Sequence, residues 1–139
     1  MALQYHPDLG TIVICDFSGI RPEMVKRRPA IIISPRFRTR NGLCTVVPLS
    51  TTEPSLIMPY HYRLTVAPSL PAPYDSPFHW VKCDMLATVS FRRLNLPFNG
   101  RDATGKRQYD TRVIGTDDLN QIRKCILHAI DLSFLTAHL

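Results

Sequence analysis

The 139 residues have a hydrophobic content of 45% and a charged content of 20%, proportions that indicate one globular domain over residues 1–139 and exclude a disordered chain. No apolar run approaches the roughly 18–20 residues that span a bilayer, and the N-terminus lacks the basic start and apolar centre of a secretion signal, so we expect a cytoplasmic protein with no membrane association. The net charge of +6 and the pI near 9.5 favour an anionic partner.

Three apolar, β-branched runs in the first part of the chain predict three consecutive strands. They cover residues 12–17, 30–34 and 43–49, and Gly, Pro and Asn-Gly bound them. The aliphatic run between Pro29 and Pro35 shows no polar alternation, which indicates a strand buried on both faces. The sequence therefore begins as a small sheet of neighbouring strands.

The linker between the first two strands and the end of the third carry most of the chemistry. Between positions 21 and 40 there is one carboxylate, Glu23, among seven basic residues: Arg21, Lys26, Arg27, Arg28, Arg36, Arg38 and Arg40. A solvated basic surface would explain such a run, but its clustering in two consecutive loops favours nucleic acid. The third strand ends in Ser50-Thr51-Thr52, and in a small sheet these hydroxyls can meet the linker at one end. That combination of groups suits a phosphodiester.

The second half of the chain predicts further short strands and one helix. Residues 60–66 alternate as a half-exposed strand, 67–77 form a proline-rich connector, and 78–91 form a strand or strand pair around Asp84. The polar, Gly-containing segment 95–111 receives no assignment. We expect Thr116 to cap a helix whose first turn holds two acids and whose apolar face packs on the sheet. The positions of that face are Leu119, Ile122, Ile126, Leu127, Ile130 and Phe134. Mainly β structure with a C-terminal helix predicts a strongly bent sheet closed as a barrel.

The cysteine and histidine residues predict no metal site and no cofactor. The four cysteines are widely separated inside apolar runs, so we expect buried free thiols. The histidines have no paired partner by spacing. We expect all five to be ordinary surface or interface residues: His61 and His79 on or beside strands, and His6, His128 and His138 near the chain ends or on the helix.

Several of these segments, in this order, resemble the MazF/PemK family of endoribonuclease toxins from toxin–antitoxin systems. The first strand opens on Gly and closes on Asp-Phe, Glu23 lies six residues before the Pro of Arg-Arg-Pro-Ala, and later strand ends read Ser-Pro and Val-Pro-Leu-Ser-Thr. The segment CDMLATVSFRRL is similar to the family's Ala-Asp-Gln strand and turn, with Cys83 and Met85 as departures. The Pro usual after the first strand's Asp is also missing. The likeness covers residues 8–94, and the helix more loosely.

The resemblance implies an SH3-like barrel, shared by MazF, PemK and the gyrase poison CcdB. It also implies a metal-independent, sequence-specific endoribonuclease toxin that cleaves single-stranded RNA (mRNA) as a homodimer and is neutralised by a cognate antitoxin. Two alternatives stay open, because fold does not fix function. One is a CcdB-like topoisomerase poison that cleaves nothing, and the other is a catalytically idle SH3-like module that binds RNA or protein.

Aligned on the family, three residues receive catalytic roles. Glu23 accepts the proton of the RNA 2′-hydroxyl, unless it forms a salt bridge with a neighbouring cation. Arg28 stabilises the charge of the transition state. Ser50 donates to a phosphate oxygen, with Thr51 as the alternative because a one-residue register error would exchange them; a strand-end turn cap is the structural explanation of Ser50. The residues expected to bind RNA are Arg21, Lys26, Arg27, Arg36, Thr51 and Thr52.

Overall fold

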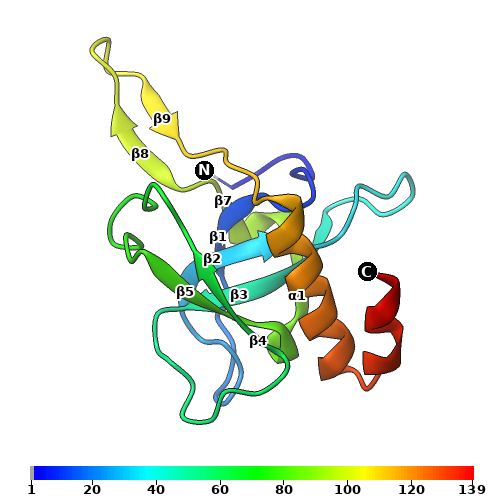
Figure 1. The fold of residues 1–139 in the computed structure, drawn as a ribbon. Coiled ribbons are helices and arrows are strands. Elements are labelled where there is room, and N and C mark those ends of the chain that lie inside the picture. Colours follow the sequence, from blue (N-terminus) through cyan, green and yellow to red (C-terminus); the bar gives the residue numbers. More distant parts are fainter. Residues whose placement is uncertain (1) are drawn as a thin grey trace.

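The three N-terminal strands form the centre of a bent antiparallel sheet (Figure 1). A computed structural model describes residues 2–139. The strands are β1 (Ile12–Asp16), β2 (Arg27–Ile32) and β3 (Leu43–Ser50). β2 begins at Arg27 rather than at Ala30, because Arg27 and Arg28 continue the ladder opposite the end of β1. The basic end of the linker is therefore part of the sheet.

β3 is the strand at which the sheet bends. Its partner on one edge is β2, while on the other edge its first half pairs with β6 and its last two residues pair with β5. The remaining strands of the sheet are β4 (His61–Thr65), β5 (Phe78–Lys82), β6 (Ala87–Ser90) and β7 (Leu94–Asn95). The strand order is β4-β5-β3-β2-β1-β7, with β6 on β3. The expected fold class is confirmed, although within residues 2–139 the end strands β4 and β7 do not pair, so the bent sheet is not a closed ring of strands.

Apolar clusters cover both faces of the central strands. On one face, Ile12, Ile31 and Val47 pack with Ile122 and Cys125 of α1 (Thr116–Ala129). On the other face, the remaining side chains of the same strands pack together with residues of β6 and β7. Residues 30–32 are fully buried, as the uninterrupted aliphatic run predicted. Short 3-10 turns lie at Cys83–Met85 (η1), Phe91–Arg93 (η2) and Ser133–His138 (η3).

The helix differs from the expectation at both ends. Gly115, not Thr116, is the N-cap residue, and no side chain caps the helix there. Asp118 is held instead by Tyr62 of β4, whose hydroxyl donates to its Oδ1 at 2.5 Å. The helix stops at Ala129, so Ile130 and Phe134 are exposed rather than packed on the sheet. Among the described residues, no helix combines the length and apolar composition that a membrane span requires.

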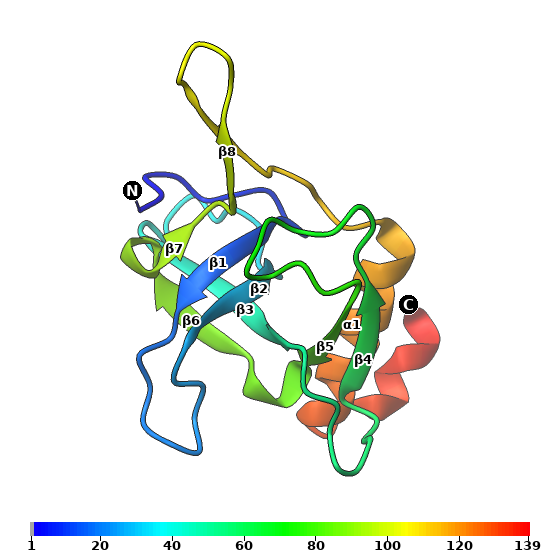
Figure 2. The same ribbon diagram turned by 90° about the vertical axis from the view of Figure 1, so that its left-hand side faces the viewer.

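The segment 95–111, left without an assignment by the sequence, contains a separate β-hairpin. Its strands are β8 (Phe98–Arg101) and β9 (Arg107–Tyr109), which pair only with each other in the described structure. In its turn, Asp102 Oδ1 accepts hydrogen bonds from the backbone N–H groups of Thr104 and Lys106. The hairpin projects from the body of the molecule (Figures 1 and 2).

The four cysteines are buried free thiols, as expected, whereas His6 and His79 do not have the expected surface or interface position. All four cysteines are buried and free, and burial raises the pKa of Cys15 to about 12 and of Cys44 to about 11. His6 is buried and its Nε2 lies 3.0 Å from Ser34 Oγ. His79 has only 1% of its surface exposed, so the expectation of a surface or interface position is wrong: β5 turns this side chain inward, on the same side as Val81.

Candidate active site

The loop between β1 and β2 positions Glu23 beside the beginning of β2. The loop is narrow at its neck, where Gly19 N–H donates to the Met24 carbonyl at 3.1 Å. A Cβ at Gly19 would collide with that carbonyl oxygen, so only glycine allows the two sides of the neck to approach this closely. Beyond the neck, Glu23 N–H donates to the Ile20 carbonyl at 2.8 Å. This turn fixes the backbone from which the Glu23 side chain extends.

Arg28 and Ser50 lie just beyond the paired part of two neighbouring strands. The last pair of the β2–β3 ladder joins Ala30 to Pro48, and Arg28 and Ser50 each lie two residues further on, where both line the same cavities. Ser50 Oγ accepts a hydrogen bond from Thr52 N–H at 3.2 Å, which is the turn cap expected at a strand end. A hydroxyl that accepts in this way retains its own proton to donate.

Glu23, Arg28 and Ser50 line one cavity of about 450 Å³, which we call the basic cavity. Arg21 and Lys26 line it too, together with Lys82 at the end of β5. The structure therefore brings the three expected catalytic residues together with two of the expected RNA-binding residues. Lys82 was not predicted as a site residue because it lies far along the chain from Glu23 and Arg28. Its position directly before the CDM segment, which resembles the family, was the one signal that could have indicated it.

A second cavity of about 220 Å³, the hydroxyl cavity, shares Lys26, Arg28 and Ser50 with the first. Thr51, Thr52 and Arg27 line it as expected, and Tyr74 and His79 line it as well. Neither ring nitrogen of His79 makes a hydrogen bond of normal geometry. Burial lowers the pKa of His79, and the nearby carbonyls of Ser76 and Tyr74 only partly oppose that effect, so the imidazole is neutral at neutral pH.

The charges at these cavities are largely unpaired. Within residues 2–139 the ion pairs are Arg27–Asp16, at 3.9 Å, and Arg112–Asp110, at 2.7 Å. The salt bridge considered for Glu23 is therefore not formed. Arg28 Nε is buried without a hydrogen-bond partner, and burial lowers the pKa of this guanidinium. A buried donor without a partner is costly. Because Arg28 forms no ion pair within the described residues, its guanidinium remains free to pair with an anion.

Comparison with known proteins agrees with the geometry of the site. Residues 8–129 match the family of PemK-like, MazF-like toxins of type II toxin–antitoxin systems. The chain belongs to this family. The toxin is 27% identical over 115 residues to the putative uncharacterized protein YifN of Escherichia coli (strain K12), a match that covers 68% of this chain and 76% of YifN. It is 26% identical over 145 residues to an uncharacterized protein of Haemophilus influenzae, covering 95% of each.

Solved structures share the fold of this toxin. MazF from Deinococcus radiodurans superposes with a TM-score of 0.60 at 20% identity, covering 91% of this chain and 98% of that one. An endoribonuclease in complex with its cognate antitoxin, from a Mycobacterial species, superposes with a TM-score of 0.58 at 20% identity, covering 91% and 97%. At this level of identity the superpositions establish the architecture.

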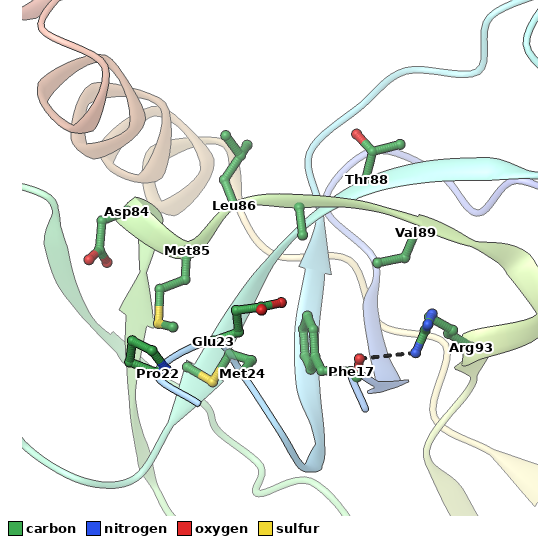
Figure 3. Close-up of a pocket in the computed structure, with 11 residues that line it drawn as sticks. Phe17, Pro22, Glu23, Met24, Asp84, Met85, Leu86, Thr88, Val89 and Arg93 are labelled. Carbon is green, nitrogen blue, oxygen red and sulfur yellow. Dashed lines mark hydrogen bonds between the residues drawn. The ribbon is translucent and has the colours of Figure 1, made fainter. Parts of the chain in front are cut away.

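A third cavity of the toxin, of about 520 Å³, lies on the other side of Glu23 and runs along β6 (Figure 3). We call it the β6 cavity. Apolar side chains such as Met24, Met85 and Leu86 contribute to its lining, with Asp84 at one end and Glu23 nearer the middle. Arg93 lies at the other end and donates from Nη1 to the carbonyls of Asp16, at 2.9 Å, and Phe17, at 3.0 Å. Arg93 thus fixes the point where the loop leaves β1, a role that the sequence did not indicate.

The basic residues of positions 21–40 separate into two groups in the toxin. Arg21, Lys26, Arg27 and Arg28 gather at the start of β2. Arg36 follows the opposite end of that strand, and its Nη2 donates to the His6 carbonyl at 2.9 Å. The length of β2 lies between Arg36 and Arg28. The structure therefore does not bring Arg36 to the cavities that the other expected RNA-binding residues line.

Proposed function

We propose that this toxin is a sequence-specific endoribonuclease that cleaves single-stranded RNA by attack of the RNA's own 2′-hydroxyl, without a metal ion. One observation carries the proposal: an unpaired carboxylate, a guanidinium without an ion-pair partner and a hydroxyl that keeps its own proton line one basic cavity. The fold shared with solved endoribonucleases and the toxin family support it.

The proposed reaction uses these groups at separate atoms of one phosphodiester. Glu23 accepts the proton of the 2′-hydroxyl as that oxygen attacks phosphorus. Arg28 and Ser50 donate to the non-bridging oxygens, where negative charge develops in the transition state. The bond to the 5′ oxygen breaks, and this leaving oxygen takes a proton from water, while Glu23 later returns its proton to the solvent. The products are a 2′,3′-cyclic phosphate and a 5′-hydroxyl.

The test is incubation of the purified protein with a long RNA in EDTA. Cleavage that persists in the chelator, with 5′-hydroxyl ends on the products, supports the proposal. Activity that disappears in EDTA and returns with Mg²⁺ contradicts it, as does cutting at a 2′-deoxy nucleotide. A complete lack of RNA cleavage by folded protein favours a non-enzymatic poison or an idle binding module instead.

We also propose that the cognate antitoxin covers the basic cavity with an acidic segment. The cavity attracts carboxylates as it attracts phosphates, because its lining holds four cations and one carboxylate among the described residues. RNA and antitoxin should then exclude one another. A titration of antitoxin into a complex of the toxin with 2′-O-methyl RNA tests this, and a ternary complex with unchanged RNA affinity would show that inhibition acts elsewhere.

The homodimer belongs to the same proposal. β6 pairs with β3 along one edge, and in the described chain its other edge has no strand partner. The exposed side chain of Leu86 and the side chain of Met85 lie in the β6 cavity beside this edge (Figure 3). A second copy that covers the edge would remove both from water. A monomeric mass in solution, measured by sedimentation across micromolar concentrations, would overturn this assignment.

A further inference from the structure

The cavities of the site continue toward the β8–β9 hairpin. The basic and hydroxyl cavities share Arg28 and Ser50. A further cavity of about 270 Å³, the hairpin cavity, shares Arg27, Pro73 and Tyr74 with the hydroxyl cavity. Figure 2 faces this side of the molecule, with the β1–β2 loop at the bottom and the hairpin at the top. Shared lining residues thus link the three cavities in a series from Glu23 to the base of the hairpin, and we call this series the path.

The lining of this path is strongly positive. Among the described residues, six cations and one carboxylate, Glu23, line the three cavities. The cations are Arg21, Lys26, Arg27, Arg28, Lys82 and Arg107. A continuous positive groove follows the backbone of a polyanion, whereas an isolated basic patch holds a single anionic group.

Exposed aromatic rings stand at the hairpin end of the path. Phe98 and Tyr109 line the hairpin cavity and are 45% and 39% exposed. Their ring centroids lie 5.9 Å apart, and the guanidinium of Arg107 lies 5.1 Å from the Phe98 centroid. Aromatic rings beside arginines are the surfaces on which unpaired bases stack, because every base presents a π face.

The base of the hairpin is held in place by polar contacts. Asp110 N–H donates to the Pro97 carbonyl at 2.9 Å, and the Asp110 carboxylate pairs with Arg112 at 2.7 Å. Arg112 also donates to the carbonyl of Pro68, in the segment that carries Pro73 and Tyr74. Both walls of the hairpin cavity are thus joined before any ligand binds, which lowers the ordering cost of binding.

We propose that the hairpin is a second RNA-binding site, which takes nucleotides flanking the cut. Their bases stack on Phe98 and Tyr109, and their phosphates lie on Arg27 and Arg107. The inference rests on the proposed function and adds to it a site outside the catalytic cavity. Single-stranded RNA is favoured over a protein partner because the path combines exposed aromatic rings with cations that line each of its cavities, up to Arg28 and Ser50.

The test measures binding of a fluorescent, mixed-sequence 20-nucleotide 2′-O-methyl RNA by anisotropy at several salt concentrations. Phe98→Ala and Tyr109→Ala should each weaken binding about tenfold or more. Arg107→Gln should lower the slope of log affinity against log salt by about 0.7, the value for one phosphate contact with a single strand. The matched control is Phe37→Ala, since Phe37 is 48% exposed beside Arg40 but lies off the path, and it should bind as the native protein does.

Two conservative variants separate recognition from folding of the hairpin. Tyr109→Phe keeps the ring and should keep the affinity, whereas Phe98→Leu keeps an apolar side chain but should lose it. Crosslinking of 4-thiouridine RNA should label residues 98–109. Native affinity in all hairpin variants, with native cleavage intact, would overturn this inference and leave the proposed function standing. Hairpin variants that lose antitoxin binding but keep native RNA affinity would also overturn this inference. If the native protein neither binds nor cleaves RNA, both this inference and the proposed function are overturned.

Discussion

Arg28 and Ser50 each lie two residues beyond Ala30 and Pro48, the last pair of the β2–β3 ladder, and they line the same two cavities. Within residues 2–139 the Arg28 guanidinium has no ion-pair partner, and its Nε is buried without a hydrogen bond, which costs stability. Ser50 accepts a hydrogen bond from Thr52 and keeps its own proton. The unpaired guanidinium and the hydroxyl can both donate to an anion bound in these cavities.

Arg28→Ala should lower the rate of RNA cleavage by about a hundredfold or more, the usual effect of removing one donor that stabilises transition-state charge. Stability should change by no more than about 1 kcal/mol, because the side chain has no partner to leave behind. Single-turnover cleavage and urea unfolding measure the two effects. Arg38→Ala removes the same charge from the exposed turn beyond β2 and is the control; equal, mild losses in both variants would reduce Arg28 to one phosphate contact among several.

Glu23→Gln should abolish most cleavage while RNA binding is retained or strengthened, since the amide cannot accept the 2′-proton and no longer repels phosphate. Binding is measured with 2′-O-methyl RNA and cleavage with unmodified RNA. Glu53→Gln is the matched control, because Glu53 is also an exposed glutamate but lines a different cavity with Arg63 and Trp80. If Glu23→Gln cleaves at the native rate, another group accepts the proton.

Ser50→Ala should slow cleavage about tenfold or more through the loss of one donor, and Thr51→Ala should have a smaller effect. The structure distinguishes the two because Ser50 lines both the basic and the hydroxyl cavity, whereas Thr51 does not line the basic cavity. Ser50→Thr keeps the hydroxyl and should restore activity. The reverse ranking of the two alanine variants in single-turnover rates would move the donor role to Thr51.

The fold should lose stability in mild acid because of His79. Burial lowers the pKa of His79 in the folded state. Below the ordinary histidine pKa of about 6.5, the unfolded chain therefore binds a proton at this residue that the folded chain does not bind. Stability is then full above that pH and falls as the pH decreases, by up to about 1.4 kcal/mol per pH unit for one group. His61, whose pKa is also lowered, chiefly by burial, contributes in the same direction.

His79→Phe should flatten this dependence and be no less stable than the native protein at pH 7.5, since it removes two buried nitrogens without partners. Urea unfolding at pH 7.5 and 5.5 measures both quantities. The control is His128→Gln, whose side chain is exposed on α1 and which should keep the native difference between the two pH values. An unchanged difference in His79→Phe would assign the acid sensitivity to other groups.

The elements that could be predicted are those whose information is local. The run around Ile31 is aliphatic without interruption because both of its faces are buried, and its burial was correctly predicted. The meeting of Glu23, Arg28 and Ser50 was also predictable, because three consecutive antiparallel strands bring the ends of adjacent strands together.

What escaped prediction depends on contacts between distant segments. Lys82 and His79 reach the site from β5, which pairs with the end of β3 only because β3 exchanges partners along its length. Arg36 belongs to the same run of charge as Arg28, yet the length of β2 separates them. The hairpin was unassigned because its strands are short, polar and closed by a turn that Asp102 organises through its side chain.

The tight neck at Gly19 makes this loop easy to inactivate by mutation. Any side chain there must push the Met24 carbonyl away, and Glu23 Cβ lies only 3.1 Å from where the new atom would stand. A single-nucleotide change in the glycine codon would therefore move Glu23 without altering any of the proposed catalytic residues. A cell that carries such a gene and loses its antitoxin can survive by this route, so surviving lineages should collect substitutions at Gly19 as readily as at Arg28.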